Sequence, residues 1–482
     1  MSYKEFFKRI DENKVIIPKG SVEGMNVDCV IFVNRELEKI IEDDSIKQII
    51  NVSKLPGIVK KSIAMPDIHS GYGFPIGGVA AFDIKDGIIS PGGVGYDINC
   101  GVRCIKTNLK KDEIKDSVKE LLTKIFLEVP SGVGSDGNVK LSKGDLKKIV
   151  LKGAKWALEN GFGDGEEIDR IESSGCIDGG DYESISEEAF ERGISQQGTL
   201  GSGNHFLEID YVSKIFDQNV AEKFGLFENQ IVIMLHTGSR GFGHQICTDY
   251  VLYFSKEFRK ESKSLPDKQL VYAPFSSNSG TMYYQAMVGA ANYAFCNRQI
   301  IGHLIKKTIL KFFKSSGKDL KVELLYDIAH NIAKIEEYEI DGKKKKLIVH
   351  RKGATRSFPK GYQQLPSIYR ETGQPVLIPG DMISGGYILV GGEKSVYESF
   401  CSTCHGAGRT LSRKQAIRFS KKTDVFKKIK ESGVFVLSQS NRTIIEEIPQ
   451  AYKNVDDVIE TVKNAELSLP VVKLLPLGVI KG

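Results

Sequence analysis

GGVGYDINCGVRC, residues 92–104, places a carboxylate (Asp97) and a thiol (Cys100) in a run otherwise rich in glycine. Five of the eight histidines, His205, His236, His330, His350 and His405, occupy runs of similar character. Glycine, serine or asparagine lies close by in each: GSGNHFLE (201–208), HTGSRGFGH (236–244), IAHNIAKIE (328–336), VHRKGATRSF (349–358) and STCHGAGRTLSR (402–413). Glycine beside a polar ligand lets the backbone approach a charged group closely. Six such runs across the chain predict that distant segments converge on one anionic, metal-bearing site.

The spread of motifs along the chain favours one large domain. The chain has 482 residues, of which 41% are hydrophobic and 27% charged, so it can bury a large core. Length alone would suggest two or three domains. However, site-like runs occur in both halves, and we find no repeat and no Pro/Ser-rich linker. We therefore expect a single domain over 1–482, with 130–183, rich in Gly, Asp and Ser around one helix, as a surface excursion.

Short strand-like runs alternate irregularly with helical patterns, which predicts a mixed α/β (α+β) fold without a strict βαβ rhythm. The strand-like runs are Ile63–Met65, Ile76–Phe82, Val102–Ile105, Phe206–Ile209, Ile231–Leu235, Val322–Tyr326, Leu347–Val349 and Val434–Leu437. Helices are predicted at about 111–127, 144–159, 243–260, 282–313, 411–419 and 454–465. Lys343–Lys346 follows Asp341-Gly342, which predicts the solvated tip of a hairpin.

Several classes of protein are disfavoured. The N-terminus is charged throughout, which is unlike a secretory signal, and no stretch approaches the roughly 18 apolar residues of a membrane span. Eight cysteines are too sparse for a disulfide scaffold, so a reduced, cytoplasmic setting is expected. Cys401-x-x-Cys404 has no second Cys-x-x-Cys motif to complete it, so it is a weak zinc motif. The net charge of +6 is compatible with a polyanionic partner.

The metal ligands are predicted from residue type and setting. Asp97-x-x-Cys100 reads as a loop that turns both groups toward one point, and Asp, Cys and His together suit Mn²⁺, Zn²⁺ or Co²⁺ better than Ca²⁺. His205, His236 and His330 each adjoin a strand or apolar run. Taken singly, each histidine is more often structural and a cysteine more often a small buried hydrophobe. Together, five ligands suffice for two ions if one ligand bridges.

Basic residues beside flexible backbone predict phosphate binding. They occur in Ser239-Arg240-Gly241, Arg351-Lys352-Gly353 and Gly408-Arg409, and the arginine fork matches phosphate oxygens. The alternative is a solvated surface charge. No Walker A run and no KxDG motif is present. His405 stands just ahead of a predicted helix, where an imidazole is well placed to attack phosphorus. Cys404 is the rival nucleophile, and metal ligation is a further role open to His405.

Taken in order, these runs resemble the RtcB family of RNA-splicing ligases over essentially the whole chain. The motifs that carry the resemblance also include MPDIHSGYGFPIGGVAAFD at 65–83 and a terminal Lys481-Gly482. The resemblance implies one RtcB-type domain with central sheets around a dinuclear metal cleft. It implies a GTP- and Mn²⁺-dependent ligase that joins RNA ending in a 2′,3′-cyclic phosphate or 3′-phosphate to RNA with a 5′-hydroxyl. The substrates would be tRNA halves, with archease as a candidate activator.

The resemblance also implies roles for individual residues. Two Mn²⁺ ions would be held by Asp97, Cys100, His205, His236 and His330, with Cys100 bridging. His405 would be guanylylated and pass GMP to the RNA 3′-phosphate, near Asp67. Phosphates would be neutralised by Arg240, Lys352, Arg409 and Arg413. The bound GMP would contact Asn204, Glu208, Asn331, Tyr452 and Lys481. Residues 474–477 should then tuck in the end of the chain, and Lys481 should be ordered. His350 would only position Arg351 and Lys352.

One segment departs from the family pattern. In PGDMISGGYILVG (379–391), Ile383 stands where glycine is usual and Gly386 where serine is usual. We expect guanine selectivity to be relaxed, with ATP competing better, or to be borne by Glu208 and Asp381. Two other functions compete with ligation: a dinuclear metal-dependent phosphoesterase that opens cyclic phosphates, and a non-catalytic RNA-binding scaffold. The scaffold would need a basic–aromatic strip, which is missing from the sequence.

Overall fold

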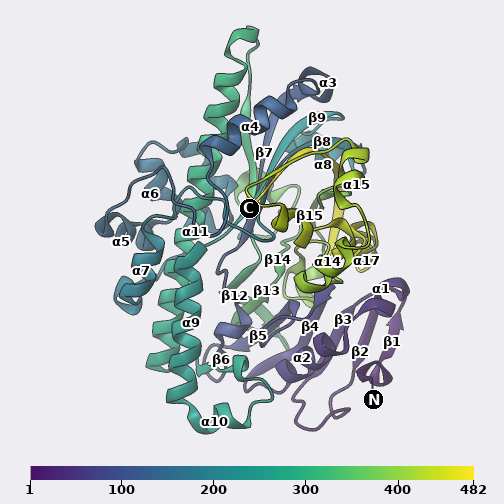
Figure 1. Cartoon of the computed structure of the whole chain (residues 1–482). Coiled ribbons are helices and arrows are strands. Elements are labelled where there is room, and N and C mark those ends of the chain that lie inside the picture. Colours follow the sequence, from purple (N-terminus) through teal and green to yellow (C-terminus); the bar gives the residue numbers. More distant parts are fainter. Residues whose placement is uncertain (1) are drawn as a thin grey trace.

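Two large sheets organise the chain in the computed structural model, which describes residues 2–482 (Figure 1). The seven-stranded sheet carries the N-terminal part. Its strands in spatial order are β1 (Lys8–Asp11), β2 (Lys14–Ile17), β3 (Asp28–Phe32), β4 (Ile58–His69), β5 (Ile76–Asp83), β13 (Lys343–Lys352) and β12 (Asn331–Ile340). The predicted hairpin is present between β12 and β13, and it turns at Asp341-Gly342, both at positive φ. Lys343–Lys346, expected at the tip, instead form the start of β13.

The eight-stranded sheet contains the C-terminal strand of the chain. Its order is β11 (Val322–Ala329), β7 (Gly101–Lys110), β9 (Gln230–Thr237), β8 (Phe206–Ile215), β19 (Ser468–Lys481), β16 (Gly385–Gly391) and β15 (Pro375–Asp381), and β18 (Phe435–Ser438) pairs in parallel with β19. Two small ladders pair β6 (Ile88–Ile89) with β10 (Ala273–Pro274) and β14 (Ala354–Arg356) with β17 (Ser402–Cys404). Because β19 lies inside the sheet, the chain ends in the middle of the molecule (Figure 1).

Helices cover the outer faces of the sheets. They are α1 (Arg35–Ile40), α2 (Asp43–Ser53), α3 (Lys111–Ile114), α4 (Val118–Glu128), α5 (Lys143–Lys152), α6 (Ala154–Glu159), α7 (Glu187–Gly193), α8 (Gln218–Phe224), α9 (Arg240–Glu257), α10 (Arg259–Ser264), α11 (Asn278–Phe312), α12 (Ser367–Arg370), α13 (Ser395–Glu398), α14 (Arg413–Ser420), α15 (Val425–Ser432), α16 (Asn441–Glu446) and α17 (Val455–Asn464). Within residues 2–482, every helix is too short or too polar to cross a membrane.

Alternate side chains of the central strands contribute to hydrophobic clusters on opposite faces of the eight-stranded sheet. On β9, Val232 and Met234 belong to a hydrophobic cluster shared by both sheets, whereas Ile233 and Leu235 belong to a second cluster on the other face. Successive side chains of a strand point to opposite faces, so the two clusters lie on the two sides of this sheet. The second cluster includes residues of α4 and α11. The arrangement confirms the mixed α/β class expected from the sequence.

The predicted elements agree with the structure apart from their boundaries. All eight strand-like runs lie in or overlap strands, and the predicted helix 282–313 is α11. The expected helices at 111–127 and 144–159 are each divided in two. In the second case the break is Gly153, whose φ of +55° is unfavourable for other residues, and an added Cβ there would collide with the Gly175 carbonyl oxygen. Through α5 and α6, the segment 130–183 packs against α11.

α11 fastens the strand ends through buried polar side chains. The fully buried Arg298 donates from Nε to Asp327 (2.9 Å) and from Nη1 to the carbonyl oxygens of Asn99 (2.7 Å) and Thr237 (3.1 Å). Its neighbour Asn297 donates to Gly238 O (3.3 Å) and accepts from Gly198 N (2.8 Å). One turn of helix therefore binds the backbone of several loops far apart in sequence.

Replacing Arg298 with Met should lower the free energy of unfolding by about 3–5 kcal/mol, because it leaves buried carbonyls and part of the charge of Asp327 without their partner. Arg298→Lys should recover only part of this loss, since one ammonium cannot reproduce the planar fork. Urea unfolding of metal-free protein measures the change. The exposed Arg259→Met is the matched control and should leave the midpoint unchanged. A wild-type midpoint for Arg298→Met would contradict this account.

Candidate active site and metal centre

Neighbouring strands bring the five predicted metal ligands to one edge of the eight-stranded sheet. His236 lies on β9 opposite Val102 of β7 and Phe206 of β8, while Ala329 pairs with Gly101. Asp97 and Cys100 immediately precede β7, His205 precedes β8, and His330 follows β11. Because these strands are adjacent, residues at their ends must lie close together.

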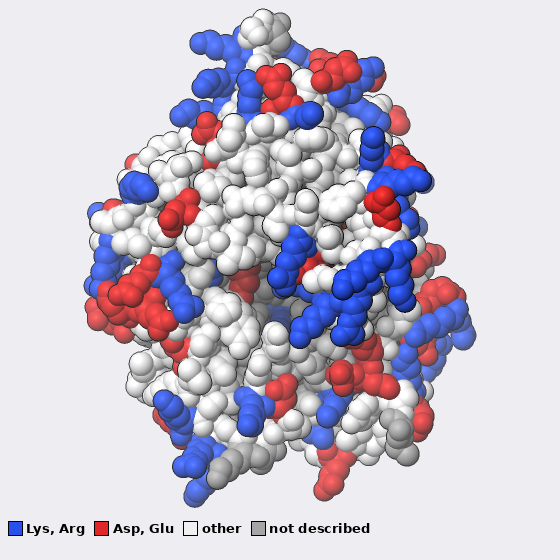
Figure 2. Space-filling model, in the orientation of Figure 1, with Lys and Arg blue, Asp and Glu red and all other residues white. Residues whose placement is uncertain are grey.

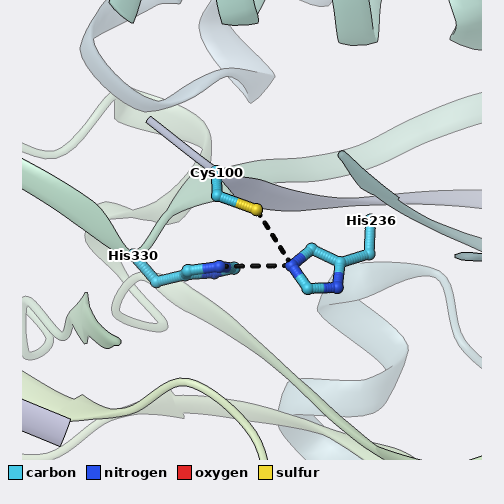
Figure 3. A group of neighbouring side chains, drawn as sticks. All are labelled: Cys100, His236 and His330. Carbon is cyan, nitrogen blue, oxygen red and sulfur yellow. Dashed lines mark hydrogen bonds between the residues drawn. The ribbon is translucent and has the colours of Figure 1, made fainter. Parts of the chain in front are cut away.

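The ligand atoms form two groups that share Cys100. In the first, Cys100 Sγ is 3.2 Å from His236 Nε2, which is 3.2 Å from His330 Nε2 (Figure 3). In the second, Cys100 Sγ is 3.4 Å from His205 Nε2, which is 2.7 Å from Asp97 Oδ2. The thiol and the three imidazoles are almost fully buried. The Cys100 sulfur belongs to both groups, as a ligand that bridges two ions would have to.

The protonation states fit metal binding. Burial drives the pKa values of His236 and His330 well below the usual range, so both imidazoles are neutral and offer a lone pair. Burial alone would raise the pKa of Asp97, but attraction to His205 and Arg240 outweighs it and keeps the pKa low. Burial, reinforced by Asp97, raises the pKa of the Cys100 thiol well above normal. A divalent ion would have to displace that proton.

Contacts behind the ligands fix their orientation. His236 Nδ1 lies 3.2 Å from the Asn204 carbonyl oxygen, which directs Nε2 toward the cluster. Arg240 Nη1 lies 3.3 Å from His205 Nδ1. His330 Nδ1 has no hydrogen-bond partner within residues 2–482.

His405 is held beside the metal ligands by a carboxylate from the other sheet. It follows β17, and its ring centroid lies 4.8 Å from that of His330. Asp67, on β4, accepts from His405 Nδ1 (2.6 Å) and from the His405 backbone N–H (3.0 Å). Burial opposes ionisation of Asp67, yet the attraction and hydrogen bonds of His405 keep its pKa low. With Nδ1 bound to Asp67, Nε2 is the ring nitrogen left for another partner.

A cavity of about 570 Å³ opens over His405 and His236. Eight predicted residues line it: Asn204, His236, Lys352, His405, Arg409, Arg413, Tyr452 and Lys481. Lys481 is only 4% exposed and pairs with Phe206 and Ser438, which confirms that the end of the chain is ordered. Burial lowers the pKa of Lys352 to about 8.

The other predicted nucleotide contacts, Asn331, Asp381 and Glu208, are not among the residues that line the cavity. Asn331 donates to Asp97 O (3.1 Å) and accepts from Gly353 N (2.8 Å), so its amide joins two loops. Asp381 accepts from the backbone of Ile383 and Ser384. Glu208 is 6% exposed on β8; burial raises its pKa to about 7, although Lys481 opposes the shift.

Three further residues that the sequence singles out, Arg351, Cys404 and His350, belong neither to the ligand groups nor to the cavity lining. Arg351, expected on the phosphate side, is instead buried in an ion pair with Glu336 (2.8 Å), because alternate residues of β13 face opposite ways. Cys404, the rival nucleophile, is fully buried and its pKa is raised by that burial. His350 lies outside the two ligand groups; its Nε2 accepts from Ser90 N (3.2 Å) and its ring packs on Phe82.

Two buried charges that sequence patterns do not reveal organise the cavity wall. Glu447 is fully buried and binds Arg409 Nη1 (2.7 Å), Arg413 Nε (3.2 Å) and the Tyr452 hydroxyl. Lys453 donates to the carbonyl oxygens of Pro66 and Ile68, on either side of Asp67. Neither residue lies in a glycine-rich run, and the only local signal is the position of Lys453 directly after Tyr452.

Comparisons with known proteins agree with this geometry. The sequence model described as "tRNA-splicing ligase RtcB" matches residues 48–482. The tRNA-splicing ligase RtcB of Archaeoglobus fulgidus is 48% identical over 482 residues and covers all of both chains. The protein of the same name from Thermococcus kodakarensis is 49% identical over 476 residues, 98% of each chain. That of Methanococcus maripaludis is 46% identical over 479 residues, 99% of this chain and all of its own.

Titration with Co²⁺ should reveal two bound ions per chain and a near-ultraviolet thiolate-to-cobalt band. Cys100→Ala should abolish the band, and His330→Ala should remove one ion, because it takes a ligand from one group only. Since each thiolate formed releases a proton, affinity should rise roughly tenfold per pH unit below the thiol pKa. Cys176→Ala, at a distance from the ligand groups, is the control. A band that survives in Cys100→Ala would exclude the bridging sulfur.

Proposed function

The chain belongs to the RtcB family of tRNA-splicing ligases, and from that premise we propose that it seals RNA by guanylylation of His405. The RNA ends would be a 2′,3′-cyclic phosphate or 3′-phosphate and a 5′-hydroxyl, with GTP as the co-substrate and Mn²⁺ as the metal. The observation that carries this proposal is the hydrogen bond of His405 Nδ1 to Asp67 (2.6 Å). It leaves Nε2 as the free nucleophilic nitrogen, beside the candidate metal ligands and at the cavity.

The residues of the chain support three successive transfers. First, His405 Nε2 attacks the α-phosphorus of GTP; the N–P bond forms, the bond to the β-phosphate oxygen breaks, and pyrophosphate leaves. Second, an oxygen of the RNA 3′-phosphate attacks the same phosphorus and the N–P bond breaks. Third, the 5′-hydroxyl oxygen attacks the RNA phosphorus, GMP leaves, and the hydroxyl proton goes to solvent. A terminal cyclic phosphate would first be opened by water.

Charged side chains have distinct tasks in these steps. Asp67 stabilises the imidazolium character that develops when Nε2 bonds to phosphorus. Lys352 and Arg409 line the cavity and would neutralise phosphate oxygens. Asp97, Cys100, His205, His236 and His330 would hold two Mn²⁺ ions, which when bound polarise phosphoryl oxygens and offset their charge. Arg240 contacts His205 and would orient that ligand.

Nucleotide contacts are proposed for the wall next to His405. Asn204, Tyr452 and Lys481 line the cavity. Asn331 pairs with the lining residue Lys352, and Glu208 lies on β8 two residues from the lining residue Phe206. Glu208 is the group suited to guanine, because a carboxylate can accept from both N1–H and the 2-amino group of that base. Asp381 is less suited, since one of its oxygens already accepts two backbone N–H groups. tRNA halves would be the RNA substrates, and archease would act as an activator.

Incubation with α-³²P-GTP and Mn²⁺ should label the wild-type protein, and His405→Ala should reduce the label at least 100-fold. The label should be lost in acid, as expected of a phosphoramidate. Cys404→Ala should keep the label, because the buried Cys404 is not the nucleophile. Co²⁺ binding by His405→Ala verifies that the metal centre survives. An unlabelled wild-type enzyme that still opens cyclic phosphates would favour the phosphoesterase alternative.

The preference for GTP over ATP should be modest near pH 6 and should rise as the pH passes through about 7. The rise follows from the raised pKa of Glu208: its carboxylate, which accepts from guanine, predominates only above that value. Gly386 adds no hydroxyl, and a Cβ there would lie only 2.6 Å from Ile378 O. Competition for His405 labelling measures the preference. Glu208→Gln should flatten its pH profile, whereas Glu222→Gln should not. A preference above about 100-fold at both pH 6 and pH 8 would contradict relaxed selectivity.

A further inference from the structure

The net charge of the protein is concentrated in one short segment beside the cavity. Residues 411–434, termed here the basic arm, contain eight Lys and Arg but only two Asp and Glu. The whole chain has 67 basic and 61 acidic residues, so the rest of the sequence carries 59 of each. The entire formal charge of +6 therefore comes from the basic arm.

Packing turns these charges outward. Ala416, Val425 and Ile429 are the buried residues of α14 and α15, and they join a small hydrophobic cluster that includes Met382 and Val479. All the basic residues of the arm are exposed: Arg413, Lys414, Arg418, Lys421, Lys422, Lys427, Lys428 and Lys430. Figure 2 shows blue side chains gathered in this region, next to a hollow in the same face. The two helices thus present a continuous cationic surface.

Most of these cations lack an acidic partner. Lys427 lies 3.9 Å from Glu431, and Arg413 binds Glu447. For the other six, no carboxylate lies within 4.0 Å in the described part of the chain: Lys414, Arg418, Lys421, Lys422, Lys428 and Lys430. The lysine run of the β12–β13 hairpin differs, because Lys344 pairs with Glu337 (3.5 Å) and Lys345 with Asp83 (3.7 Å). Unneutralised like charges repel one another, so the arm is suited to a polyanion.

The basic arm begins inside the cavity. Leu411, Ser412 and Arg413 line it together with His405. Arg413 is half exposed, and its Nε is bound by Glu447, the buried carboxylate that also holds Arg409 and Tyr452. A polyanion on α14 would therefore approach His405 through Arg413.

We propose that the basic arm binds the phosphodiester backbone of the RNA strand whose reacting end lies in the cavity. This inference rests on the proposed function and extends it to the body of the substrate. Recognition would be independent of sequence, because lysines contact phosphates as point charges. The arm has two aromatic residues, the exposed Phe426 and the partly buried Phe419, so base stacking contributes little.

The test removes four charges remote from the cavity: Lys421, Lys422, Lys427 and Lys428, each replaced by Gln. For an RNA substrate with about 20 nucleotides on each side of the joint, KM should rise about 10- to 100-fold near 0.1 M salt. The slope of log affinity against log salt should become shallower by about 0.7 for each RNA phosphate that the variant no longer neutralises. His405 labelling by GTP, kcat at saturating RNA and the thermal midpoint should stay at wild-type values.

Two controls isolate the effect. Replacing Lys343, Lys344, Lys345 and Lys346 by Gln removes the same charge from the hairpin and should leave KM for RNA unchanged. Substrates with only two nucleotides on each side of the joint are too short to reach the outer lysines and should be ligated equally by the arm variant and the wild type.

The outcomes that would overturn the two proposals are distinguishable. Absence of labelling and ligation in the wild-type protein would overturn the proposed function itself. A ligating wild type together with an arm variant of unchanged KM and salt slope would overturn only this inference. The same would hold if RNA binding were unchanged while the variant failed to bind an acidic protein partner, since the arm would then serve that partner. Equal losses of RNA affinity in the arm and hairpin variants would also overturn it, because the effect would reflect total charge.

Discussion

The guanidinium of Arg298, buried between α11 and the ends of the strands, is the contact on which the candidate site depends. It binds the carbonyls of Asn99 and Thr237, which flank the ligands Cys100 and His236, and it pairs with Asp327 on the strand that leads to His330. Strand ends expose backbone groups that need partners when they are buried. Arg298 satisfies these groups from one side chain, and so ties the positions of three ligand-bearing segments to one helix.

The proposed nucleophile His405 is held by a separate set of contacts, and the candidate site forms where the two sets of contacts meet. Asp67 belongs to the seven-stranded sheet, whereas the metal ligands stand at the edge of the eight-stranded one. Lys453 binds the carbonyls on both sides of Asp67. Gly408, with φ of +74°, lies against the Asp67 carbonyl oxygen where any Cβ would collide. The loop of His405 can therefore close on Asp67 only with glycine at this position.

The sequence predicted the parts of this site that have local signatures, and not the parts that depend on distant partners. Short apolar runs identified the strands, and histidines at their ends identified the metal cluster, because adjacency in a sheet brings strand ends together. Arg298, Asn297 and Glu447 could not be predicted this way. In the sequence Arg298 is one polar residue in a helical pattern, and its role appears only when strands from three regions surround it. The phosphate-binding role expected of Arg351 was wrong for the same reason: its partner Glu336 lies across a hairpin.

The buried cation Lys352 and the exposed cations of the basic arm would interact with an anion in different ways. Lys352 is buried beside the cavity with a pKa lowered to about 8, so its charge is costly until an anion compensates it. The lysines of the basic arm stay hydrated and interact with an anion over the screened distance of about a Debye length. High salt should therefore weaken long-range capture much more than the contacts at His405. Under the proposed function, this separation would let the arm hold an RNA strand of any sequence while the buried groups act on its terminal phosphate.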